Sequence, residues 1–254
     1  MAEPAKAREV RIERSERRVR VRACGEWIAD TASPLLMLER GRVPVYYLPK
    51  GDVRMDLLER APGRTHCDTK GEAAYYTLRV GGLVEEGVAW SYEHPIPGRE
   101  QLAEYIAFYW DRMDHWFEED EEVFVHPRDP HKRVDAIRSS RHVRVVMSGE
   151  TVAETTRPVL LFETGLPTRY YIPPQDVRLE LLEPSGRRTQ CPYKGVASYH
   201  SVRVGGALAE DVVWHYPFPI PECPKIEGLL AFYSERVDLY VDGVLQERLP
   251  GRTG

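Results

Sequence analysis

Cysteine is scarce in this chain, and its spacing argues against the usual structural uses of the residue. The 254 residues include four cysteines: Cys24, Cys67, Cys191 and Cys223. No two of them form a Cys-x-x-Cys pair, so neither a zinc ribbon nor a thioredoxin-like redox motif is expected. Four cysteines are also too few for a disulfide framework in a chain of this length.

Long apolar runs and an excess of positive charge are absent as well. No segment approaches the ~18 apolar residues that a membrane-spanning helix needs. The charged segment Met1–Glu16 lacks the apolar stretch of a signal peptide. The formal net charge is −5, which gives no sign of the basic surface that binds nucleic acid. We therefore expect a cytoplasmic protein with no membrane partner and no nucleic-acid partner.

What the chain does contain is one sequence written twice. Residues 17–117 align with residues 141–241 at a constant offset of 124 residues, and about 44 of the 101 aligned positions are identical. An ungapped match of this length indicates one fold that has been duplicated. We predict a flexible tail over residues 1–16, a first domain over 17–125, a linker over 126–140 and a second domain over 141–250.

The pattern of apolar residues within each copy predicts strands followed by one helix. Residues 18–22 alternate Arg and Val, and Gly81-Gly82 is a turn dipeptide between two β-rich runs. Apolar residues recur at helical spacing over residues 102–116, and again over 226–240. We therefore predict two mainly β domains with antiparallel sheets, each closed by a C-terminal amphipathic helix.

A Cys-x-x-Lys-Gly segment kept in both copies is the main candidate for chemistry. Cys67 and Lys70 of the first copy match Cys191 and Lys194 of the second. An ammonium group near a thiol lowers the thiol pKa, and the thiolate is the reactive form, so Cys191 and Lys194 are the candidate catalytic residues. Two alternatives stay open: the lysine holds a phosphate or carboxylate of a ligand, or it pairs with an acidic residue of the chain in a structural role.

Charged and aromatic residues kept in both copies supply further candidates. The charged residues are Glu39, Arg54 and Arg79, with Glu163, Arg178 and Arg203 at the matching positions. These arginines either form structural ion pairs with the glutamates or hold an anionic ligand. The aromatic residues are Tyr46, Tyr47, Tyr75, Trp90 and Tyr92, with Tyr170, Tyr171, Tyr199, Trp214 and Tyr216. Strand alternation predicts that one ring of Tyr46-Tyr47 faces the core and the other faces outward, where it could wall a pocket for a flat ligand.

Motifs for known cofactors and metals are missing. No Walker loop, Rossmann fingerprint or serine nucleophile elbow occurs. The histidines of one copy have no histidine at the matching position of the other, so no metal spacing recurs. We predict no cofactor and no metal.

With these residues in view, the chain resembles a tandem member of the domain-of-unknown-function family 427. The stretches that carry the resemblance are Arg169-Tyr170-Tyr171-Ile172-Pro173, Cys191-Pro192-Tyr193-Lys194-Gly195 and Ser201-Val202-Arg203-Val204-Gly205-Gly206. The resemblance implies a β-tent domain similar to the Mss4-like fold. Relatives with that fold often bind zinc through two cysteine pairs, which this chain lacks. The family resemblance also implies that single-domain relatives pair as dimers, so that this chain would be a covalent pseudo-dimer.

The second copy follows the family pattern Cys-Pro-Tyr-Lys-Gly, whereas the first has Asp68-Thr69 in place of Pro-Tyr. We therefore place the predicted small-molecule site, for an anionic or planar ligand, in the second copy, and leave open whether it also catalyses a reaction. The predicted ligand-binding residues are Tyr171, Arg178, Tyr199, Arg203, Trp214 and Glu163, with Cys67, Lys70, Arg54, Arg79 and Trp90 in the first copy. The alternatives are a protein-interaction or scaffold module and, from a label carried by some family members, a nucleotidyltransferase-like activity.

Overall fold

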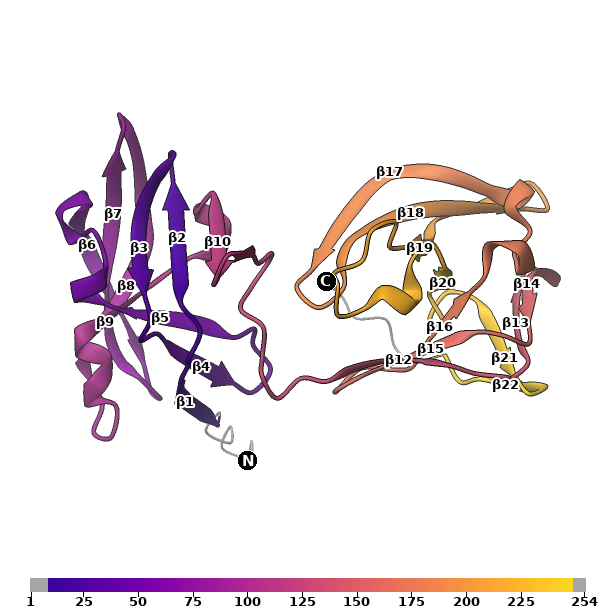
Figure 1. Cartoon of the computed structure of the whole chain (residues 1–254), viewed down its shortest axis with the longest axis horizontal. Coiled ribbons are helices and arrows are strands. Elements are labelled where there is room, and N and C mark those ends of the chain that lie inside the picture. The colour runs from indigo at the N-terminus through magenta and orange to yellow at the C-terminus, as the bar shows by residue number, and fades with distance from the viewer. Residues whose placement is uncertain (1–8, 249–254) are drawn as a thin grey trace, which may run out of the picture. The chain divides into compact units, whose positions relative to one another are not determined.

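The computed structural model describes residues 9–248, which divide into two compact units, one ending at Asp129 and the other beginning at Pro130. Figure 1 labels most of their strands. The strands of the first domain are β1 (Val10–Arg14), β2 (Val19–Ala23), β3 (Glu26–Thr31), β4 (Leu35–Glu39), β5 (Val45–Pro49), β6 (Leu58–Cys67), β7 (Gly71–Val80), β8 (Leu83–Pro95), β9 (Tyr105–Phe108), β10 (His115–Glu118) and β11 (Glu121–Glu122). Those of the second are β12 (Val134–Arg138), β13 (Val143–Met147), β14 (Glu150–Thr155), β15 (Val159–Glu163), β16 (Arg169–Ile172), β17 (Leu182–Cys191), β18 (Gly195–Val204), β19 (Ala207–His215), β20 (Leu230–Phe232), β21 (Asp238–Val241) and β22 (Val244–Leu245).

Each domain contains one seven-stranded and one four-stranded antiparallel sheet. The long sheet of the first domain has the order β1-β4-β5-β9-β8-β7-β6, and the short one has β11-β10-β2-β3. The second domain repeats both orders with β12-β15-β16-β20-β19-β18-β17 and β14-β13-β21-β22. The prediction of two similar, mainly β domains is therefore confirmed.

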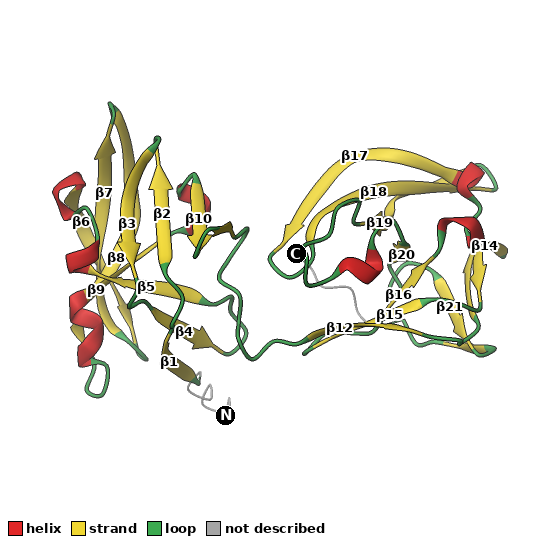
Figure 2. Ribbon diagram, in the orientation of Figure 1, coloured by secondary structure: helices red, strands yellow, loops and turns green. Residues whose placement is uncertain are grey.

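The predicted C-terminal helices are wrong. The segment from residue 100 to 118 consists of a 3₁₀ turn at Glu100–Glu104, strand β9, a second turn at Trp110–Arg112 and strand β10, and Figure 2 shows only short helical turns in both domains. Strand β9 is central in its sheet, so Ile106, Ala107 and Phe108 are all buried instead of alternating. Consecutive buried residues mimic helical spacing, which is why periodicity alone misassigned the segment.

The predicted tail and linker each contain a strand and need correction. Strand β1 lies inside residues 1–16 and pairs with β4, and β12 lies inside residues 126–140 and pairs with β15. In β1, Val10 is buried and Ile12 packs against the core, while charged residues separate them. The duplication thus extends beyond residues 17–117. The remainder of the predicted tail, residues 1–8, lies outside the described residues.

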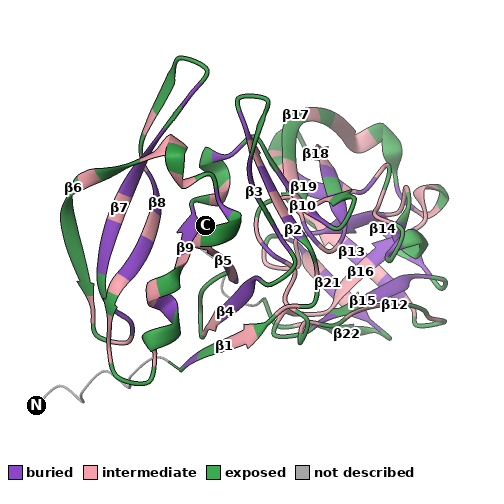
Figure 3. Cartoon of the chain, turned by 60° about the vertical axis from the view of Figure 1, so that its left-hand side comes forward, coloured by how far each residue is buried: buried purple, intermediate pink, exposed green. Residues whose placement is uncertain are grey.

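The long sheet of the first domain is covered on both faces, as the buried residues along β7 and β8 in Figure 3 indicate. One face packs against β2, β3 and β10 in a core that includes Tyr46, and the opposite face forms a second cluster that includes Tyr47. The alternation expected for Tyr46-Tyr47 is present. However, both rings are 2% exposed, because the face expected to be open is covered too. No helix in residues 9–248 is long and apolar enough to cross a membrane.

Candidate ligand pocket

A pocket of the first domain opens where β5 and β9 separate. The two strands pair at Leu48 with Ile106 and at Pro49 with Tyr105. Beyond these pairs, the residues from Val45 to Tyr47 and from Phe108 to Asp111 line a pocket of about 920 Å³. A pocket at such a split receives side chains from both faces of the sheet. This explains why Tyr46 and Tyr47, which point in opposite directions, both line it.

Aromatic rings make up much of the pocket wall. Trp90 contacts Tyr109 with ring centroids 4.7 Å apart, and Trp110 stacks on Trp116 at 4.3 Å with an interplanar angle of 8°. The indole N–H of Trp90 donates a hydrogen bond of 3.0 Å to the Tyr47 hydroxyl, which fixes both rings. Rings held in this way offer rigid flat faces to a ligand at little cost in conformational entropy.

A buried ion pair lies in the same pocket. The Nζ atom of Lys70 is 2.6 Å from Oε2 of Glu39, and both side chains are less than 10% exposed. The other carboxylate oxygen of Glu39 lies 3.3 Å from Nε of Arg42. The ammonium of Lys70 therefore pairs with an acidic residue of the chain, as the structural alternative for this lysine requires. The acidic residue is Glu39, at the end of β4.

The thiol of Cys67 lies beside this pair. Burial opposes ionisation, but hydrogen bonding to Thr69, with Sγ and Oγ1 3.3 Å apart, and the charge of Lys70 together lower the pKa of the Cys67 thiol below its usual value. In the second domain, Cys191 occupies the matching place. A further cysteine, Cys223, is buried there, and burial raises the pKa of its thiol.

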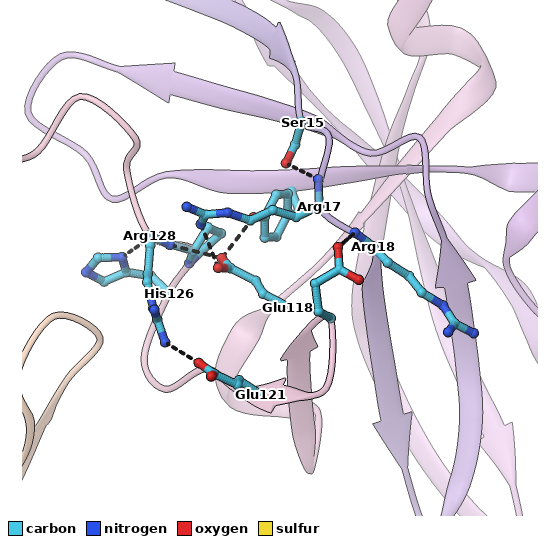
Figure 4. Close-up of polar contacts among 10 residues, drawn as sticks. Ser15, Arg17, Arg18, Glu118, Glu121, His126 and Arg128 are labelled. Carbon is cyan, nitrogen blue, oxygen red and sulfur yellow. Dashed lines mark hydrogen bonds and ion pairs between the residues drawn. The ribbon is translucent and has the colours of Figure 1, made fainter. Parts of the chain in front are cut away.

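The segment after β11 forms another wall of the pocket. Figure 4 shows the polar contacts of Glu118 that anchor this segment. The carboxylate of Glu118, at the end of β10, accepts a 2.9 Å hydrogen bond from the Tyr46 hydroxyl and lies 2.6 Å from Nη1 of Arg17. It also accepts a hydrogen bond from the backbone N–H of Arg128. This contact anchors the chain next to His126 and Pro127, which line the pocket.

A smaller pocket lies at the matching place of the second domain. Its volume is about 170 Å³, and its lining includes Tyr171, Lys194, Tyr199 and Trp214. Arg169, which replaces Val45, places its guanidinium between the ends of β16 and β20. There its nitrogens lie 2.6 and 2.8 Å from the two carboxylate oxygens of Glu235. The side chain of Arg169 therefore occupies space that is empty in the first domain.

A model of the family described as Domain of unknown function (DUF427) matches the chain twice, at residues 11–119 and 135–243. The chain belongs to this family. The two matches begin at β1 and β12, so each covers one folded unit and confirms the tandem arrangement that the sequence indicated. No curated protein matches the chain.

The structure gathers some of the predicted site residues of each DUF427 domain and separates others. In the first domain Cys67, Lys70 and Trp90 line one pocket. In the second, Glu163, Tyr171, Lys194, Tyr199 and Trp214 line the smaller one. Cys191 is the one predicted catalytic residue that is not among its lining residues, although it precedes Lys194 in the same tight turn.

The predicted arginines lie outside both DUF427 pockets. Arg54 pairs with Asp56 and Arg79 with Glu59, while Arg203 pairs with Glu183, all at exposed positions. Arg178 likewise pairs with Glu150 and Glu180. The ion-pair alternative therefore describes the contacts of these arginines, but their partners are not the glutamates kept at the ends of β4 and β15.

Sequence comparison between the copies missed the residues that differ, and these set the shape of each DUF427 pocket. Val45 and Asp111 stand where the second domain has Arg169 and Glu235. A signal was available, because an exchange of valine for arginine next to the kept Tyr46-Tyr47 pair changes volume and charge together. Among residues 9–248, no three His, Cys, Asp or Glu side chains come close enough to hold a metal ion.

Proposed function

We propose that the first DUF427 domain binds a flat small molecule in the pocket between β5 and β9, and that the second domain is a filled relative of this site. The observation that carries the proposal is the 920 Å³ pocket with its fixed aromatic walls and buried charged group. Pockets for small ligands are typically of roughly 300–1,000 Å³, mostly apolar, with a few placed polar groups.

The difference between the two domains supports this assignment. The Tyr47–Trp90 hydrogen bond recurs as Tyr171–Trp214, at 3.0 and 3.1 Å, so the two pockets share one frame. The pocket volumes differ, at about 920 Å³ in the first domain and about 170 Å³ in the second. The proposal thus moves the expected site from the second copy to the first.

The proposal is for binding and does not extend to catalysis at the Cys-x-x-Lys segment. The ammonium groups of Lys70 and Lys194 are each buried against a carboxylate of the chain and are therefore already paired. For Lys194, burial opposes the charge, but Cys191 and Glu163 outweigh it and raise the pKa above the usual value. No observation on the described residues favours the nucleotidyltransferase-like alternative.

A thermal-shift screen of flat aromatic compounds tests the proposal, with Val45→Arg as the control variant. Arginine is accommodated at this place in the second domain, so the variant should fold and place its guanidinium beside Trp90 and Tyr109, where it competes with a ligand. A ligand at ~100 times its Kd should stabilise the wild-type protein by about 2.7 kcal/mol, and this stabilisation should vanish in Val45→Arg. Compounds that stabilise both proteins equally, or no stabilising compound at all, would contradict the proposal and favour the interaction-module alternative.

A further inference from the structure

In the second domain, the side chain of Arg169 occupies the aromatic part of the pocket. The guanidinium carbon of Arg169 lies 5.6 Å from the ring centroid of Trp214 and 5.9 Å from that of Tyr233. Its nitrogens also contact the hydroxyl of Ser234, at 3.0 Å, and both carboxylate oxygens of Glu235. Its side chain is 20% exposed. Two aromatic rings and a carboxylate thus hold a planar cation at this place.

The first domain has a matching aromatic pair and carboxylate but no arginine between them. Trp90 and Tyr109 match Trp214 and Tyr233 and keep their geometry: the ring centroids are 4.7 Å apart at 47° in one domain and 4.5 Å apart at 44° in the other. Asp111 stands in place of Glu235, and Val45 stands in place of Arg169. All four of these first-domain residues line the 920 Å³ pocket.

The carboxylate of Asp111 interacts with the charge of the neighbouring Arg112 but forms no direct ion pair with it. It takes part in no hydrogen bond or ion pair within residues 9–248 at ordinary distances, and the neighbouring Arg112 pairs with Glu85 instead. By contrast, the buried carboxylate of Glu39 in the same pocket has two cationic partners, Lys70 and Arg42. Trp110, stacked on Trp116, adds a further aromatic face beside Asp111.

We infer that the ligand of the first domain carries a planar cation, a guanidinium or amidinium group, which sits against Trp90 and Tyr109 and pairs with Asp111. The guanidinium of Arg169 then occupies, in the second domain, the place that the cationic group of the ligand occupies in the first. This inference rests on the proposed binding function and narrows its ligand. It replaces the anionic ligand expected from sequence, because the lysine and arginines expected to hold an anion are already paired.

Three probes of nearly equal shape and different charge test the inference: benzamidine, benzamide and benzoate. Each is titrated calorimetrically into the full chain, into Asp111→Asn and into Asp114→Asn, which removes the same charge at an exposed position outside the pocket lining. We expect benzamidine to bind at least about tenfold more tightly than benzamide, since a charge-assisted pair is involved, and benzoate to bind most weakly. Asp111→Asn should remove most of this preference, and Asp114→Asn should leave it unchanged.

The outcomes separate this inference from the function on which it rests. Benzamide or benzoate binding as tightly as benzamidine would overturn the cation while leaving a pocket for flat ligands in place. A benzamidine preference that survives Asp111→Asn would overturn the assigned carboxylate in the same way. If neither these probes nor any flat compound of the screen binds the wild-type chain, the proposed function fails, and the inference fails with it.

Discussion

Val45 and Arg169 occupy the same place in the two domains, and both residues line a pocket. The frame around them is alike, since Tyr47, Trp90 and Tyr109 have identical counterparts. From sequence, the residues kept in both copies could be predicted to lie together. The kept lysines and tryptophans do line one pocket in each domain, whereas the kept arginines lie elsewhere. The pocket volumes could not be predicted, because they depend on the paths of side chains such as Arg169, which pairs with Glu235.

A first prediction concerns the buried carboxylate of Glu163. Burial opposes its charge, but Lys194 and Lys132 outweigh burial and lower the pKa of Glu163 below its usual 4.5. A lowered pKa means that this carboxylate stabilises the folded state above pH 4.5, and that the stabilisation is lost as pH falls through the folded-state pKa. Glu163→Gln should therefore cost about 3 kcal/mol of unfolding free energy at pH 7, and the cost should shrink in acid below pH 4.5. Urea unfolding across pH, followed by circular dichroism, measures both.

The matched control for this prediction is Glu183→Gln. Glu183 also pairs with a kept cation, Arg203, but both side chains are about half exposed. Solvent screens such a pair, so little change in stability is expected. Equal losses in the two variants, or a loss in Glu163→Gln that does not depend on pH, would contradict the assignment of Glu163 as the buried partner.

At the scale of elements, the sequence predicted strands well where alternation was clear and failed where strands were short and central. In the first domain the segment from 102 to 116 looked helical because Leu102, Ile106, Met113 and Trp116 are all buried. In the second domain Gly228 interrupts the same segment with a positive φ of 65°. A glycine in the interior of a predicted helix is unfavourable, so this position was a signal against the helix.

The structure explains why glycine follows lysine in the turn at Lys70-Gly71, which the sequence alone could not explain. Gly71 adopts φ of 109°, and the backbone N–H of Ile96 donates a 3.1 Å hydrogen bond to the carbonyl of Lys70. A Cβ atom at Gly71 would lie 2.3 Å from the carbonyl oxygen of His94 and 2.8 Å from Cα of Pro95. The glycine kept in both copies is thus explained by the close approach of the backbone that ends β8.

A second prediction follows for Gly71→Ala. Backbone atoms cannot move aside as a flexible side chain can, so overlap and strained φ together should cost about 3 kcal/mol or more. Gly81→Ala is the control, since Gly81 also has a positive φ, of 57°, but a Cβ there would meet nothing within 4 Å. It should cost about 1 kcal/mol. The urea midpoint of each full-length variant measures the difference, and equal midpoints would contradict the close approach described for Gly71.

At the scale of the whole molecule, duplication has produced two DUF427 domains with one frame and unequal pockets. The ungapped repeat made the two-domain architecture predictable, while the strands β1 and β12 showed that each domain is longer than the clear sequence match. We propose one ligand site per chain, in the first domain. In the second domain an ion pair between Arg169 and Glu235 bridges the ends of β16 and β20.

Counting binding sites tests this claim most directly. The tightest compound of the screen is titrated calorimetrically into the full chain and into Arg169→Val, which gives the second domain the valine of the first. We predict one site per wild-type chain and two per Arg169→Val chain, the second weaker because Ser234 and Tyr240 replace Trp110 and Trp116. Two sites in the wild type, or a single site that persists unchanged in Arg169→Val, would contradict the account.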